Sequence, residues 1–102
     1  MLTIRPERLD RDSVVLFISG RLDTTTASTL ELKLRQFLDG NTDLIFDLKD
    51  LSYISSSGLH VLLQTLKAMK ESNRKLVIKN IGEAVRNVFE MTGFMSLITV
   101  EE

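Results

Sequence analysis

Residues 44–63 read LIFDLKDLSYISSSGLHVLL, and within this stretch a strand pattern gives way to a helix pattern. Residues 44–48 form a short apolar run that is typical of a buried strand. From Leu59 onward apolar residues recur at spacings of three and four, which predicts a helix over residues 57–72. Three serines, Ser55 to Ser57, separate the two patterns. The stretch therefore predicts a strand, a loop and a helix that carries hydroxyl groups at its start.

The serines at this helix start allow two interpretations. The first turn of a helix has backbone N–H groups without intrahelical partners, and the aligned peptide dipoles place a partial positive charge there. Such a position favours anions, so a serine there can carry a phosphate without breaking the fold. Serine is also among the preferred N-cap residues, and one of the three could do no more than cap the helix. Both interpretations stay open at this point.

The rest of the chain alternates strands with helices in the same way. Two extended segments come first, with polar residues between them, which predicts an antiparallel hairpin. Helix patterns then alternate with short apolar runs, and Gly40 and Gly93 supply stop signals. The predicted strands cover residues 2–5, 13–18, 44–48, 75–79 and 97–100, and the predicted helices cover 25–39, 57–72 and 81 to about 93. The order ββαβαβαβ predicts a single small α/β domain over residues 1–102, with a mixed β-sheet and covering helices.

This topology predicts where the polar loops meet. In parallel βαβ units the loops that leave the carboxyl ends of the strands emerge at one edge of the sheet. The loops over residues 20–26, 49–57 and 80–83 leave predicted strands in this way. Their polar residues are therefore candidates for a single surface: Asp23, Thr24, Ser55, Ser56, Ser57 and Asn80.

Composition excludes several classes of function. The chain has 102 residues, of which 43% are hydrophobic and 26% charged, as in a soluble globular domain. Its net charge of −1 provides no basic face for nucleic acid, and no apolar run approaches the roughly 20 residues that span a bilayer. The absence of cysteine and the single histidine exclude thiolate sites and sites built from several imidazoles. We expect a cytoplasmic protein without metal, cofactor, nucleic-acid partner or membrane insertion.

The serine segment does not match the common enzyme motifs. The nucleophile elbow G-x-S-x-G is only half met, because Gly58 fits its last position while Ile54 replaces its first glycine. His60 lies four residues past Ser56 near the start of the same helix, and no later histidine can act as a general base. We interpret His60 as an exposed residue beside the serine surface. No phosphate-binding G-x-x-x-x-G-K-[ST] loop is present, and the aspartates show no metal-ligand spacing.

The chain resembles the STAS-domain anti-sigma factor antagonists of bacteria. The resemblance covers nearly the whole chain. It rests on Gly20-Arg21-Leu22-Asp23 before the first helix, on residues 44–48 leading into Tyr53-Ile54-Ser55-Ser56-Ser57-Gly58-Leu59, and on Leu76-Val77-Ile78 before the third helix. It implies a non-enzymatic partner-switching module that binds an anti-sigma factor with serine kinase activity. A PP2C-type phosphatase is expected to reset the module, which would thereby regulate sigma-factor-dependent transcription.

The resemblance also implies which serine is modified. The family motif is usually Asp-Ser-Ser-Gly-Leu with its first serine phosphorylated, and that serine corresponds to Ser56 here. Ser55 stands where the family often has aspartate, so Ser55 and Ser57 remain alternative acceptors. Loss of a carboxylate beside the acceptor removes repulsion toward a dianionic phosphate and is compatible with phosphorylation. The expected partner-binding residues are Asp23, Thr24, Ser55, Ser56, Ser57, Gly58 and His60.

Two alternatives remain at the level of sequence. Asp23 and the threonines that follow it could simply cap the first helix instead of contacting a partner. STAS-like modules also serve as scaffold subunits of transporters and stress-sensing complexes, and this chain could be one of them. The serine motif favours the phosphorylation switch over the scaffold.

Overall fold

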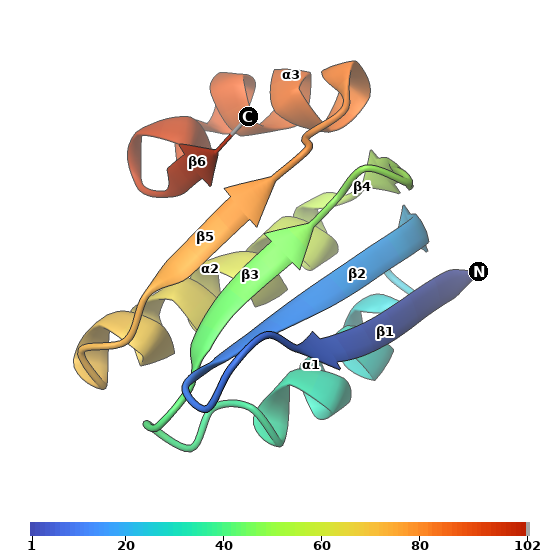
Figure 1. Ribbon diagram of the computed structural model, residues 1–102. Helices are drawn as coiled ribbons and strands as arrows, with labels where there is room; N and C mark the ends of the chain where they lie inside the picture. The colour runs from blue at the N-terminus through green and yellow to red at the C-terminus, as the bar shows by residue number, and fades with distance from the viewer. Residues whose placement is uncertain (102) are drawn as a thin grey trace.

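The computed structural model describes residues 1–101 (Figure 1). In its β-sheet, strand β2 (Ser13–Leu22) pairs with three other strands. Its run of β-branched and other apolar residues suits a strand with neighbours on both sides. Strand β1 (Leu2–Arg8) pairs with it antiparallel along one edge. On the other edge β3 (Asp43–Asp47) pairs with its first half and β4 (Leu51–Ile54) with its last residues, both parallel. Strands β5 (Leu76–Lys79) and β6 (Thr99–Glu101) extend the sheet beyond β3, again in parallel.

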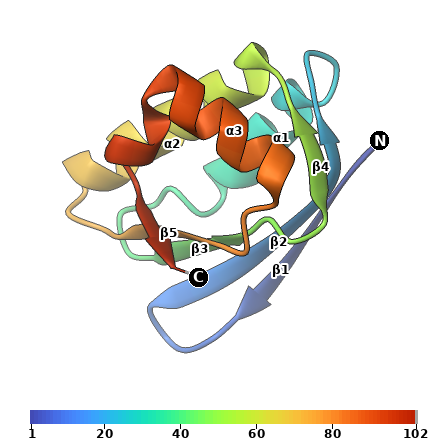
Figure 2. The same ribbon diagram turned by 90° about the horizontal axis from the view of Figure 1, so that it is seen from above.

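Three α-helices, α1 (Ala27–Arg35), α2 (Ser56–Glu71) and α3 (Glu83–Thr92), lie on the same side of the sheet (Figure 2). A short 3₁₀-helix, η1 (Phe94–Ser96), follows α3 and continues the layer. The core forms between this layer and the sheet because alternate strand residues point toward the helices. Its fully buried side chains include Leu16, Phe46, Leu62, Ile78 and Phe89. The observed architecture confirms the predicted α/β class with a mixed sheet and covering helices.

The predicted order of elements was wrong at one place. Residues 49–57 were expected to form a loop, yet residues 51–54 form the short strand β4, so the order is ββαββαβαβ with η1 before the last strand. Only Leu51 and Ile54 of this strand are buried, so it has neither an apolar run nor a strict alternation. Its strand conformation is stabilised by non-local pairing with the end of β2. The sequence around it gives no local signal for that pairing.

The first helix is shorter than predicted. The expected span of 25–39 contracts to Ala27–Arg35. At its start, residues 24–26 form a turn fixed by Asp23. At its end, the backbone N–H groups of Phe37 and Leu38 bond to carbonyls three residues back, which tightens the chain out of the α-helical ladder. The other helices end within two residues of their predicted limits, a normal uncertainty for helix termini.

Among the described helices, none combines the length and the apolar character that a bilayer crossing requires.

Candidate functional site

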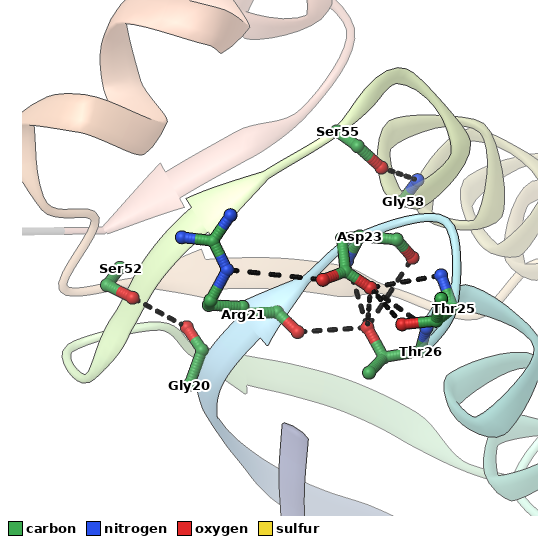
Figure 3. A network of polar contacts seen from close by, with 8 residues as sticks. All are labelled: Gly20, Arg21, Asp23, Thr25, Thr26, Ser52, Ser55 and Gly58. Carbon is green, nitrogen blue, oxygen red and sulfur yellow. Dashed lines mark hydrogen bonds and ion pairs between the residues drawn. The ribbon is translucent and has the colours of Figure 1, made fainter. Parts of the chain in front are cut away.

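The carboxyl end of β2 is joined to β4 around Gly20. Its φ of +98° lies in the left-handed region that glycine tolerates, and a Cβ there would clash with the carbonyl oxygen of Met1. The N–H of Gly20 donates to the carbonyl of Asp50 at 2.9 Å, and the hydroxyl of Ser52 donates to the carbonyl of Gly20 at 2.9 Å (Figure 3). These bonds hold β4 beside the end of β2, and the loops that follow both strands consequently meet at this edge.

Ser55 is the N-cap of α2. Its backbone is extended, and its hydroxyl oxygen accepts a hydrogen bond from the N–H of Gly58 at 3.2 Å (Figure 3). Its carbonyl accepts the first helical bond, from the N–H of Leu59. Its own N–H donates to the carbonyl of Leu22 at 2.9 Å, which ties the cap to β2. The capping interpretation of the serine segment therefore applies to Ser55. Ser56 and Ser57 begin the helix proper.

Gly58 is buried and lets the first turn of α2 approach β2. A Cβ at this position would lie 2.6 Å from Cγ of Leu22, closer than real Cβ atoms approach, and 3.0 Å from the carbonyl oxygen of Leu22, which is a tight contact. Glycine is thus required here by packing and not by an unusual backbone angle. Gly58 was predicted to contact a partner, and this stays a prediction; its burial gives it a packing role in addition.

The three serine hydroxyls differ in environment. The Oγ atom of Ser57 lies 3.4 Å from the Oγ1 atom of Thr24, and Ser57 is half-buried. Ser55 is also half-buried, and its oxygen is occupied by the cap. Ser56 is exposed. Its backbone N–H belongs to the first turn of α2, where helical N–H groups have no partner within the helix.

Asp23 organises the turn that leads into α1. Its Oδ1 atom accepts hydrogen bonds from the hydroxyl of Thr25 at 2.7 Å, the N–H of Thr25 at 3.0 Å and the N–H of Thr26 at 3.1 Å (Figure 3). The hydroxyl of Thr26 in turn accepts from the N–H of Asp23 at 2.9 Å, a reciprocal arrangement like a capping box. The hydrogen bond from the Thr25 hydroxyl is the main cause that holds the pKa of Asp23 below its ordinary value of 3.8. Asp23 therefore fixes the turn that precedes α1, whose own N-cap, Thr26, makes no side-chain capping bond. A contact of Asp23 with a partner stays a prediction.

Arg21 and Tyr53 add a feature that sequence reasoning missed. They are register partners across the β2–β4 pair, and the guanidinium of Arg21 lies 4.1 Å from the centre of the Tyr53 ring. The Nε atom of Arg21 is 4.0 Å from Oδ2 of Asp23 (Figure 3). The stack therefore borders the Asp23 turn. Both side chains are exposed at the edge that carries the serines. Recognition of β4 from the sequence would have been needed to pair them.

An apolar hollow of about 240 Å³ opens beside Ser56. Its walls come from the start of α2, from the end of α3 and from the segment around η1. The residues that line it are Ser56, Leu59, His60, Leu63, Thr92, Phe94 and Leu97. His60 is exposed, as predicted from the sequence, and it shares this hollow with Ser56.

The predicted convergence of three loops holds for two of them. The contact between Thr24 and Ser57 joins the loop after β2 to the start of α2, as expected. Asn80, from the third loop, instead donates from Nδ2 to Oδ2 of Asp47 at 2.9 Å at the end of β3. Within residues 1–101 no group of three or more potential metal-binding side chains is present.

The comparisons with known proteins agree with this fold. Residues 4–102 match the family model described as the STAS domain. The anti-sigma-B factor antagonist of Staphylococcus aureus is 34% identical over 88 residues, covering 83% of this chain and 80% of its own. The anti-sigma-B factor antagonist of Bacillus subtilis is 31% identical over 91 residues, covering 89% and 84%.

A solved structure shows the same likeness in three dimensions. The crystal structure of an anti-sigma factor antagonist from Mycobacterium paratuberculosis aligns with a TM-score of 0.85 at 25% identity, covering 98% of this chain and 85% of that one. A match over nearly the whole chain, together with relatives above 30% identity, identifies the family. This chain belongs to the STAS domain family.

Proposed function

We propose that the chain is an anti-sigma factor antagonist whose binding to an anti-sigma factor with serine kinase activity is ended by phosphorylation of Ser56. The observation that carries the proposal is the exposed hydroxyl of Ser56 at the first position of α2, in a STAS domain whose curated relatives are anti-sigma-B factor antagonists. These relatives favour the antagonist over the scaffold alternative. In this role the chain is a regulator and the substrate of a kinase, not an enzyme.

The geometry favours Ser56 over its neighbours as the acceptor. A kinase needs a hydroxyl that can reach the γ-phosphorus of ATP, and Ser56 is the exposed one of the three. In the transfer its Oγ forms the new P–O bond, the bond to ADP breaks, and the hydroxyl proton passes to a base of the kinase. Ser55 would have to give up its cap to Gly58, and Ser57 its contact with Thr24.

Phosphorylation is expected to change binding with little change in the fold. It adds about −1.5 to −2 charges, and the helix start stabilises an exposed anion by roughly 0.3–1 kcal/mol. A partner packed against Ser56 has no such compensation, because it would have to bury that charge. Each loss of about 1.4 kcal/mol weakens binding tenfold. The switch then acts by electrostatic exclusion and needs no hinge.

We further propose that the partner covers both the hollow, which Ser56 lines, and the Arg21–Tyr53 stack, which belongs to the strand ends just before the serine segment. Apolar walls of the hollow, formed by Leu59, Leu63 and Phe94, suit an apolar side chain of the partner. Arginine and tyrosine are enriched among residues that dominate binding energy at interfaces. Ser56 lies at the rim of the hollow, so its phosphate would stand at the entrance.

Intact-mass measurement tests the proposal most simply. The protein is incubated with ATP and a candidate anti-sigma factor kinase, and the modified residue is mapped by fragmentation. We expect a gain of one phosphoryl group on Ser56 and no gain in a Ser56→Ala variant. A phosphoryl group on Ser55 or Ser57 instead would refute the assignment. A phosphatase of the PP2C type should then remove the group.

A further inference from the structure

His60 lies one helical turn beyond Ser56 on α2. Residues four apart in a helix are neighbours on the same face, and the Cα–Cβ bonds of a helix tilt toward its N-terminus, so the side chain of His60 leaves the backbone on the side of Ser56. Both residues line the same hollow, and both are exposed. The capping bond of Ser55 to Gly58 holds this first turn of α2 in a defined position.

Among the residues that line the hollow, His60 is the one with an ionisable side chain. The loop that contacts the start of α2 through Thr24 and Ser57 carries Arg21 and Asp23, which form an ion pair with each other. The other walls of the hollow are Leu59, Leu63, Thr92, Phe94 and Leu97, from α2, α3, η1 and the segment after it, and none of them ionises. The helix α1 packs on another side of α2, where its Glu31 and Arg35 line a separate depression with Val61, Gln64 and Thr65. On α2 itself the next charged residue is Lys67, about two turns beyond His60.

From this placement we propose that the His60 imidazolium pairs with the phosphate on Ser56 and keeps that phosphate dianionic at lower pH than it would otherwise be. The proposal rests on the proposed function, since it concerns the phosphorylated state of the same site. Phosphoserine loses its second proton at about pH 6 and an imidazole loses its proton at about pH 6.5, so both groups change charge in the same range. Opposite charges one turn apart stabilise each other, and the two titrations become coupled.

The consequence concerns the strength of the switch. A dianionic phosphate excludes a partner more strongly than a monoanionic one, because more charge must be desolvated in the interface. His60 would therefore preserve the released state when the pH falls toward 6. In this way one residue outside the three-serine segment sets the pH range of the regulation.

The test uses protein in which phosphoserine is incorporated at position 56 during translation, so that no kinase is needed. The ³¹P chemical shift is followed between pH 4.5 and 8.5 in this protein and in its His60→Gln variant. We expect the midpoint to lie about 0.3–0.5 pH unit lower with His60 than with glutamine, and the difference to shrink at high salt. The imidazole resonances of this single histidine should also shift on phosphorylation.

A matched control places phosphoserine at Ser72, the exposed C-cap of α2, twelve residues from His60. There the His60→Gln change should leave the midpoint unmoved. Equal midpoints with and without His60 at position 56 would overturn the proposal. Because His60 is exposed, the glutamine variant should fold normally. A kinase that modifies a different residue would refute the proposed function instead, and this titration would still report on the pairing.

Discussion

At the scale of single residues, the site depends on a close approach that only glycine permits. Gly58 sits in the first turn of α2 against Leu22, and the cap on Ser55 closes over it. Alanine normally stabilises a helical position relative to glycine by up to about 1 kcal/mol. At Gly58 the clash with Leu22 should outweigh this preference. Whether alanine at position 58 raises or lowers the free energy of unfolding therefore shows which of the two effects is larger.

We expect Gly58→Ala to lower the free energy of unfolding by about 1–3 kcal/mol, because the new methyl group overpacks against Leu22. Urea unfolding followed by circular dichroism measures the change. Gly82→Ala is the control, because a Cβ there meets no atom within 4 Å. Since Gly82 is the N-cap of α3, where glycine is preferred to alanine, its cost should stay below about 1 kcal/mol. A Gly58→Ala protein as stable as the wild type would contradict the packing role.

The carboxylate of Asp23 makes stability depend on pH. Its hydrogen bond from Thr25 lowers the folded-state pKa below the ordinary value of 3.8, so near that pH the unfolded state binds more protons than the folded state. The stabilisation is present above this range and is lost as the pH falls through the folded pKa. Asp23→Asn keeps a capping residue without a titrating group and should show a shallower loss of stability from about pH 5 downward.

Thermal unfolding at pH 3 to 7 compares the two proteins. Thr25→Val removes the hydroxyl that contributes most to the lowered pKa of Asp23. It should make the stability of the otherwise wild-type protein depend less on pH, and it should leave the pH dependence of the Asp23→Asn protein unchanged. If the thermal stability of the wild type and of Asp23→Asn changed with pH in parallel, the carboxylate of Asp23 would not be the cause of the pH dependence.

At the scale of elements, the start of α2 explains the departure from the usual family motif. The position that often holds aspartate is the N-cap, where serine and aspartate serve almost equally well. Ser55→Asp should therefore change the free energy of unfolding by less than about 0.5 kcal/mol, whereas Ser55→Ala should cost about 1 kcal/mol. Chemical denaturation of the three proteins measures this. A loss as large in Ser55→Asp as in Ser55→Ala would argue against the capping role.

The elements also show how far the sequence could predict this structure. Local signals such as apolar periodicity, stop glycines and the serine-rich helix start correctly indicated three helices and five of the six strands. Strand β4 was missed because only two of its four residues are buried and its stability comes from pairing with the distant end of β2. The same omission hid the Arg21–Tyr53 stack, which depends on that register. The different environments of the three serine hydroxyls could not be predicted either, because they depend on tertiary contacts with Leu22 and Thr24.

At the scale of the whole molecule, the features of the site gather at one edge of the sheet and on the adjoining helical layer. The chain has a net charge of only −1, so long-range steering of a partner is weak and shape at this edge must provide most of the recognition. The hollow beside Ser56 is the feature that suits an inserted side chain. Charge placed at its rim should therefore disturb binding without disturbing the fold.

Leu97 offers a test of this surface, because it lines the hollow and is 48% exposed. We expect Leu97→Glu to weaken binding to the anti-sigma factor at least tenfold, or about 1.4 kcal/mol, with little loss of stability. Leu9→Glu is the control, since Leu9 is 54% exposed and lies outside the hollow, in the hairpin between β1 and β2. Calorimetric titration gives both affinities. If the two substitutions weakened binding equally, the hollow would not be part of the interface.

The most direct measurement is the affinity of the anti-sigma factor for three forms of this chain: unmodified, Ser56→Ala, and carrying phosphoserine at position 56. We expect the alanine form to bind within about threefold of the unmodified chain, and the phosphorylated form to bind at least about tenfold more weakly with an unchanged far-UV spectrum. Equal affinity of the phosphorylated and unmodified forms would contradict the electrostatic switch.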